Sequence, residues 1–138
     1  MRNGSERGGT VIGLRPEEKP RLLLVEDEAL VAMMIQETLA DLGFNVIGPV
    51  STASGALAAA RESYFDAAVL DINLGDGLVY TVAEILEKRG VPFVFVTGYD
   101  ADSIDARFGG VPVLQKPIER DMLQKIFAPR DDRALATG

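Results

Sequence analysis

The sequence predicts an α/β protein with a doubly wound, five-stranded parallel sheet and helices on both faces. Short apolar runs alternate with amphipathic stretches of helical period across residues 21–127, as in strands joined by helical crossovers. The run at residues 67–70 is apolar throughout, as expected for a strand that helices cover on both sides. Polar side chains follow most of these runs, as expected where strands reach the edge of a sheet.

The expected elements follow one another in a regular order. Strands are predicted at residues 22–25, 44–47, 67–70, 93–96 and 111–114. Helices are predicted at residues 29–42, 51–61, 79–88 and 119–127. Gly43 and Gly90 should end the first and third helices, because glycine adopts the left-handed conformation that closes a helix. The second strand is the weakest, so we expect it at an edge, closed by Gly48 and Pro49.

Several segments and side chains carry more specific expectations. Residues 100–108 are polar and poorly periodic, so no helix is predicted there, and Gly75–Asp76–Gly77 is expected to be a turn. The helix at residues 29–42 is expected to bury one apolar face, formed by Leu30, Met33, Met34 and Leu39. Core positions are expected for Phe93, Phe95 and Phe127.

The two ends of the chain differ from the middle in composition. Residues 1–20 mix glycine, proline and charge and are predicted to form a flexible arm, from which Val11, Ile12 and Leu14 could dock. Residues 128–138 are predicted to be a tail. One domain at residues 21–127 therefore accounts for the fold, and no further effector domain is expected.

Composition excludes several classes of function. The 138 residues carry a net charge of −7, which disfavours binding to nucleic acid or to an anionic membrane surface. The chain has no histidine and no cysteine, so a Ser-His-Asp triad, a disulfide and a thiolate zinc site are all impossible. No apolar run approaches the ~20 residues of a membrane span, and a cytoplasmic protein is expected.

Polar residues at four strand ends point to chemistry at one edge of the sheet. Glu26 and Asp27 follow the first strand, Asp71 the third and Thr97 the fourth, while Lys116 lies just beyond the fifth. In a doubly wound sheet these ends meet beside the crevice where the strand order reverses. Each close pair of carboxylates would repel by roughly 3 kcal/mol at an effective dielectric near 20. A hard cation, Mg²⁺ or Mn²⁺, is therefore expected together with the fixed charge of Lys116.

Each of these residues also has an ordinary structural explanation. Asp27 and Glu28 could simply favour a helix N-terminus, and Asp71 could open a loop. Thr97 could belong to a turn, and Lys116 could be an exposed charge. Their coincidence at four strand ends favours a functional site.

Four motifs, LLLVEDE, VLDINL, FVFVTGY and LQKPI, resemble in order and spacing the response regulator receiver domain of two-component signalling. The resemblance covers residues 21–127 and implies the flavodoxin-like strand order 2-1-3-4-5. It implies that Asp71 accepts a phosphoryl group from a kinase phosphohistidine or a small acyl phosphate, and that Lys116 pairs with a phosphoryl oxygen. It further implies a switch in which the Thr97 hydroxyl moves inward, a cis peptide bond before Pro117, and a Mg²⁺ ion held by Glu26, Asp27, Asp71 and the backbone carbonyl of Asn73.

Two departures from the family pattern refine the resemblance. Val113 stands where receivers commonly carry an aromatic switch residue, and Glu26 replaces the more usual aspartate. PFVFVTGY resembles the PFxFATGY signature of FAT GUY receivers, with Val96 in place of alanine. This likeness implies that Tyr99 takes over the switching role, that the following helix is short or mobile, and that the partner is an HWE-type histidine kinase.

The leading hypothesis is a stand-alone receiver that acts through protein contacts and catalyses only its own phosphorylation and dephosphorylation. Its expected partners are a sensor histidine kinase or phosphotransfer protein, an unknown output protein and, in one reading, a second copy of itself. One alternative is a degenerate receiver used as an interaction module. A phosphatase with an aspartyl intermediate ranks lowest, because Asn73 occupies the place of its second aspartate and Asp71 follows the third strand.

Overall fold

A computed structural model describes residues 12–74, 79–99 and 104–127 of the chain. Its five strands form one parallel sheet in the order β2-β1-β3-β4-β5. The bounds are Arg21–Val25 for β1, Asn45–Val50 for β2, Ala67–Asp71 for β3, Phe93–Thr97 for β4 and Val113–Gln115 for β5. The predicted fold class and strand order are confirmed.

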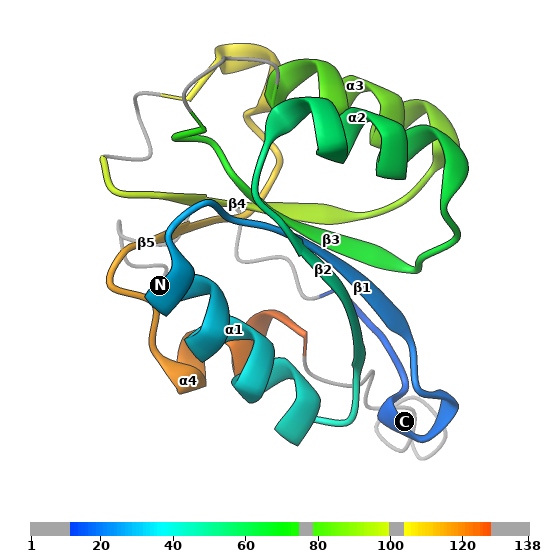
Figure 1. Cartoon of the computed structure of the whole chain (residues 1–138), viewed down its shortest axis with the longest axis vertical. Coiled ribbons are helices and arrows are strands. Elements are labelled where there is room, and N and C mark those ends of the chain that lie inside the picture. The colour runs from blue at the N-terminus through cyan, green and yellow to red at the C-terminus, as the bar shows by residue number, and fades with distance from the viewer. Residues whose placement is uncertain (1–11, 75–78, 100–103, 128–138) are drawn as a thin grey trace, which may run out of the picture.

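Within the described residues, four α-helices cover the two faces of this sheet. They are α1 at Ala29–Asp41, α2 at Ala53–Glu62, α3 at Val79–Arg89 and α4 at Arg120–Ile126. α2 and α3 lie on one face, and α1 and α4 lie on the other (Figure 1). From β1 the chain crosses to the edge strand β2 and returns to β3, so the strand order reverses between β1 and β3. The carboxyl ends of these two strands therefore flank the crevice of a doubly wound fold.

Helix ends follow local chemistry in most places. The Thr52 side chain accepts a hydrogen bond from the Gly55 N–H at 3.0 Å and caps α2. Gly43 and Gly90 have φ values of 102° and 72°, and they follow α1 and α3 as predicted. Glu28, at the N-cap of α1, makes no side-chain capping hydrogen bond.

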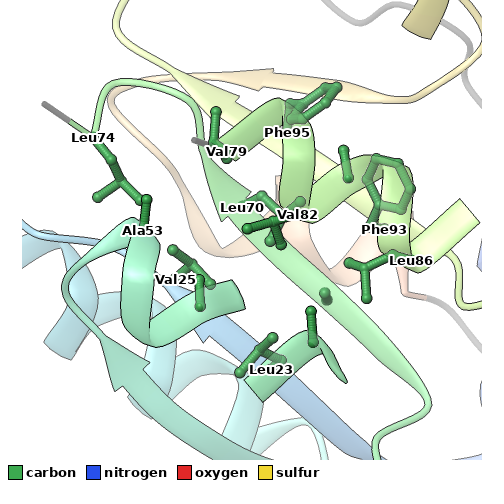
Figure 2. Close-up of a cluster of buried hydrophobic side chains, with 14 of the residues drawn as sticks. Leu23, Val25, Ala53, Leu70, Leu74, Val79, Val82, Leu86, Phe93 and Phe95 are labelled. Carbon is green, nitrogen blue, oxygen red and sulfur yellow. The ribbon is translucent and has the colours of Figure 1, made fainter. Parts of the chain in front are cut away.

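Each face of the sheet packs its own apolar core. Side chains alternate along β1, so Leu23 and Val25 join the α2–α3 core while Leu22 and Leu24 join the α1–α4 core. Figure 2 shows the first of these cores, in which Val82 and Leu86 of α3 lie over the sheet. All five residues of β3 are buried, as the apolar run predicted.

Aromatic rings hold the segment before β5 against α3. Phe108 belongs to η3, a 3₁₀ turn at Ala106–Phe108, and its ring stacks on Tyr80 with 5.5 Å between centroids. The Tyr80 hydroxyl accepts a hydrogen bond from the Asp105 N–H at 3.2 Å. Phe93 and Phe95 complete the aromatic cluster through edge contacts. No α-helix forms within residues 104–112, in agreement with the weak helical pattern there.

The prediction for the second strand was wrong at its end. β2 continues through Gly48 and Pro49 to Val50 instead of closing before them. The pairing with β1 shifts between Leu23 and Val25, which face Ile47 and Val50 respectively. β2 therefore accommodates one extra residue, as a β-bulge does, and it lies at the edge of the sheet as expected.

The predicted buried face of α1 was wrong for Leu30 and Met33 and right for Leu39. Leu30 is 80% exposed and Met33 is 53% exposed, while the side chains turned to the sheet include Ala32, Ile35 and Leu39. Leu30 precedes Ala32 by two residues, about 200° around the helix, so these two side chains cannot share a face. The expected core positions of Phe93, Phe95 and Phe127 are confirmed, and Met34 is partly buried.

Part of the predicted N-terminal arm lies against the domain. Ile12 is buried beneath α4, and its N–H donates to the Ile126 carbonyl oxygen at 2.8 Å. Leu14 is partly buried against the same core. Four predictions concern residues outside the described ones. They are those for residues 1–11, including Val11, for Gly75–Asp76–Gly77, for residues 100–103 and for the tail at 128–138.

Candidate functional site

The candidate site lies at the carboxyl ends of the strands. Asp71 and Thr97 are the last residues of β3 and β4, and Glu26 directly follows β1. Backbone hydrogen bonds extend the sheet by one residue here, from Glu26 N–H to Val50 at 3.0 Å and from Lys116 N–H to Thr97 at 2.7 Å. Residues from four strand ends are thereby held at one edge.

Three carboxylates meet in this place. Glu26, Asp27 and Asp71 each offer an oxygen atom within 4.8 Å of the others. Glu26 and Asp71 are buried, whereas Asp27 is exposed. Asp71 Oδ1 accepts a hydrogen bond from the Asn73 N–H at 2.8 Å, which fixes the orientation of this carboxylate. Of the three carboxylates, that of Asp27 is the one exposed to solvent.

Lys116 supplies the cation that faces this cluster. Its ammonium Nζ lies 3.5 Å from Asp71 Oδ2 and 3.3 Å from Glu26 Oε2, and it forms an ion pair with Glu28 Oε1. Burial of the ammonium lowers its pKa, but the hydrogen bond to Glu28 and the charges of Asp71 and Glu26 outweigh burial and raise the pKa. Lys116 therefore stays protonated at neutral pH.

Desolvation and the closeness of the three carboxylates raise the pKa values of Glu26 and Asp27. Desolvation and the neighbouring Asp71 raise the pKa of Glu26 from its ordinary value to about 7. Desolvation and the charge of Asp71 also raise the pKa of Asp27. Both shifts have the direction expected when acids of like charge share a site with too little positive charge.

The donor set suits a hard divalent cation. Glu26 Oε1 is buried and has no hydrogen-bond partner among the described residues, which is costly for a carboxylate oxygen. Mg²⁺ prefers carboxylate oxygens and retains water ligands, and the Asp27 carboxylate is exposed to solvent. The residues present therefore fit Mg²⁺, which receiver domains bind at such an acidic cluster.

The Thr97 hydroxyl is engaged with the loop after β3. It donates to Asn73 Oδ1 at 3.4 Å and accepts a hydrogen bond from the Tyr99 N–H at 3.0 Å. Asn73 Oδ1 also accepts from the Gly98 N–H at 3.0 Å. The family resemblance implied a role only for the backbone carbonyl of Asn73, so this side-chain contact between the two loops was not predicted.

The remaining predicted residues lie around this centre. Tyr99 is 66% exposed in the loop after β4, whereas Val113 is buried in the α2–α3 core. The peptide bond between Lys116 and Pro117 is cis. Glu28, considered in the sequence only as a helix-terminal acid, contacts Lys116 and was not predicted to belong to the site.

The chain belongs to the family of response regulator receiver domains, which matches residues 22–128. The fold and the cluster of acids around Asp71 are those of a phosphoacceptor receiver of two-component signalling.

Among solved structures, the chain is similar to SdrG from Sphingomonas melonis Fr1, with 44% identity and a TM-score of 0.70 over 82% of this chain and 95% of that one. A BeF₃-activated form of SdrG, reported from Pseudomonas melonis Fr1, shares 45% identity with a TM-score of 0.64 over 84% of this chain and 92% of that one. The receiver domain of the sensor histidine kinase PA1611 from Pseudomonas aeruginosa PAO1, described with magnesium in its active-site cleft, shares 28% identity with a TM-score of 0.66 over 78% of this chain and 93% of that one.

Among curated proteins, the phyllosphere-induced regulator PhyR of Methylorubrum extorquens is 38% identical over 81 residues, which cover 56% of this chain and 30% of PhyR. The transcriptional regulatory protein PdtaR of Mycobacterium tuberculosis is 29% identical over 102 residues, which cover 70% of this chain and 49% of PdtaR. The chain thus spans less than half the length of these regulators. None of the helices in the described residues is both long and apolar enough to cross a membrane.

Proposed function

We propose that this chain accepts a phosphoryl group on Asp71 from the phosphohistidine of a sensor histidine kinase or phosphotransfer protein, in a Mg²⁺-dependent step that switches its protein contacts. The observation that carries the proposal is the meeting of Glu26, Asp27 and Asp71 within 4.8 Å, with the Lys116 ammonium 3.5 Å from Asp71. The proposed receiver occupies residues 21–127, flanked by an arm and a tail.

The metal would be held by Glu26, Asp27, Asp71 and the backbone carbonyl of Asn73. Bound Mg²⁺ neutralises negative charge on the carboxylates and on the oxygens of the transferring group. Its arrival would also give a partner to the buried Glu26 Oε1.

In the proposed transfer, an Asp71 carboxylate oxygen attacks the phosphorus of the donor. A P–O bond forms as the P–N bond to the donor imidazole breaks, and the nitrogen keeps the electron pair of the broken bond. The Asn73 N–H fixes one Asp71 oxygen, and Lys116 faces the other. Lys116 then donates to a phosphoryl oxygen, which places its positive charge where negative charge accumulates.

The proposed switch is an exchange of partners by Thr97. Its hydroxyl leaves Asn73 Oδ1 and donates to a phosphoryl oxygen, which requires the loop after β4 to move. Because the Tyr99 N–H is bonded to that same hydroxyl, Tyr99 moves with it. Its exposed ring then presents a different surface to an output protein or to a second copy of the chain.

The proposed kinase and output classes rest only on the similarity of this chain to known receivers. The PFVFVTGY segment supports an HWE-type kinase as the donor, and the regulator names of the curated relatives support an output in gene regulation. Transcriptional regulation is the role that PdtaR is named for, and the present chain is proposed to share its receiver chemistry.

Acetyl phosphate and Mg²⁺ test the proposal directly. Wild type should gain a labile, metal-dependent adduct that slows its migration on a phosphate-affinity gel, and Asp71→Asn should not. Asp121→Asn, at an exposed position in the first turn of α4, is the matched control and should behave like wild type. An unmodified wild type would favour the interaction module, and repeated hydrolysis of unrelated phosphate esters would favour the phosphatase.

The switch is tested separately by Thr97→Ala. This variant should still accept the phosphoryl group, because Thr97 supplies neither the nucleophile nor a metal ligand. It should lose the backbone NMR shift changes that beryllofluoride produces in wild type. Equal shift changes in both proteins would reject the role of Thr97.

A further inference from the structure

We infer that Glu28 is a positioning residue that competes with the phosphoryl group for Lys116 and so weakens the activated state. The inference rests on the proposed function of Asp71 and Lys116. It assigns a role to a residue outside the proposed metal ligands, one that the sequence pattern explained only as a helix-terminal acid.

The three N–H donors of Lys116 are already committed to carboxylates. An ammonium group has three N–H bonds. Glu26 Oε2, Asp71 Oδ2 and Glu28 Oε1 are three acceptors for them in the described structure. When Asp71 carries a phosphoryl group, its own contact with Lys116 can pass to a phosphoryl oxygen. A second hydrogen bond from Lys116 to that group requires one of the two glutamate contacts to be given up.

Burial decides which contact is given up. Of the two glutamates, the Glu26 side chain is 1% exposed, whereas the Glu28 side chain is 61% exposed. A buried carboxylate that loses its cation stays desolvated and uncompensated, which is costly. An exposed carboxylate is solvated by water as soon as it leaves. Glu28 is therefore the partner that the phosphoryl group displaces.

The position of Glu28 on α1 makes its release easier still. Glu28 is the N-cap residue of this 13-residue helix, and its carboxylate makes no capping hydrogen bond while it holds Lys116. A released carboxylate lies near the positive end of the helix dipole and the unpaired N–H groups of the first turn. Glu28 thus has two favourable positions, one on Lys116 and one at the start of α1.

Beryllofluoride titration at saturating Mg²⁺, followed by amide NMR, measures the competition without turnover. Glu28→Gln removes the ion pair and should tighten beryllofluoride binding by about two- to fivefold, the range expected for an ion pair with one exposed partner. Glu28→Asp keeps the charge but shortens the side chain by one methylene group, so it should show at least half of that gain. Metal-free amide spectra of both variants establish that the fold is intact.

The matched control is Glu37→Gln, which removes the same charge at an exposed position of α1. Among the described residues, the carboxylates paired with Lys116 are those of Glu26, Glu28 and Asp71, and Glu37 is not one of them. It should bind beryllofluoride like wild type. Unchanged beryllofluoride affinity in Glu28→Gln would overturn the inference. A gain in Glu28→Gln without a gain in Glu28→Asp would also overturn it, because the negative charge of residue 28 would then act by repelling beryllofluoride and not by holding Lys116. Absence of beryllofluoride binding in wild type would instead reject the proposed function.

Discussion

Glu26 should make the metal-free protein less stable as the pH rises. Burial and the neighbouring Asp71 raise its pKa from the ordinary value of 4.5 to about 7. The unfolded chain releases this proton near pH 4.5, whereas the folded protein retains it until about pH 7. The contribution of the retained proton to stability is therefore fully present below pH 4.5 and lost as the pH rises through 7.

The size of this loss follows from the two pKa values. One pKa unit corresponds to about 1.4 kcal/mol. The difference between 4.5 and 7 therefore limits the loss in the free energy of unfolding to about 3 kcal/mol. The raised pKa of Asp27 acts in the same direction. Wild type in EDTA should thus lose stability between pH 5 and pH 8. Mg²⁺ should stabilise the protein more at pH 8 than at pH 5, because metal and proton compete for the same oxygens.

The assay is urea unfolding followed by far-UV circular dichroism, in EDTA, across this pH range. Glu26→Gln cannot titrate, so its free energy of unfolding relative to wild type should rise with pH by up to about 3 kcal/mol. Glu37→Gln, exposed on α1, is the control and should run parallel to wild type. Parallel curves for Glu26→Gln and wild type would refute the raised pKa.

Three further predictions concern the scaffold, each read as the free energy of unfolding in urea. Gly48→Ala should cost about 2 kcal/mol or more, because φ is 106° and the new Cβ would lie 2.7 Å from backbone atoms. At the control position, Gly110, no atom lies within 4 Å of a new Cβ, so Gly110→Ala should change stability by less than about 0.5 kcal/mol. Leu39→Ala should cost about 2–5 kcal/mol and the exposed Leu30→Ala almost nothing, and equal effects would contradict the observed face of α1. Phe108→Ala should cost about 3–5 kcal/mol and loosen the segment before β5, seen as faster amide exchange there; unchanged exchange would speak against the aromatic cluster.

The class of fold and the gathering of polar residues at one edge of the sheet were predictable because both follow from local sequence patterns. A fully apolar run such as residues 67–70 can be satisfied only where both faces are covered, and β3 is buried throughout. Parallel strands place their carboxyl ends on one edge, so Asp71 and Thr97 had to come near each other once their strands were identified. The structure indeed brings the predicted carboxylates and Lys116 together.

The face of α1 could not be predicted in the same way. Apolar residues occur around much of this helix, so its sequence permits more than one buried side. Contact with the sheet selected Ala32, Ile35 and Leu39 and left Leu30 and Met33 in solvent. The path of β2 through Pro49 was likewise decided by its pairing with β1, since an edge strand tolerates a residue without an N–H donor.

By itself, the sequence determined which polar side chains stand at the ends of β1, β3 and β4, because the apolar run of each strand stops at those residues. Only the tertiary structure decided how those side chains pair. Lys116 and Glu28 are 88 positions apart and meet because β1 and β5 end at the same edge. Asn73 and Thr97 share a hydrogen bond because the neighbouring strands β3 and β4 also end at this edge. Contacts of this range depend on side-chain reach and on which partner is buried, and no local pattern encodes either.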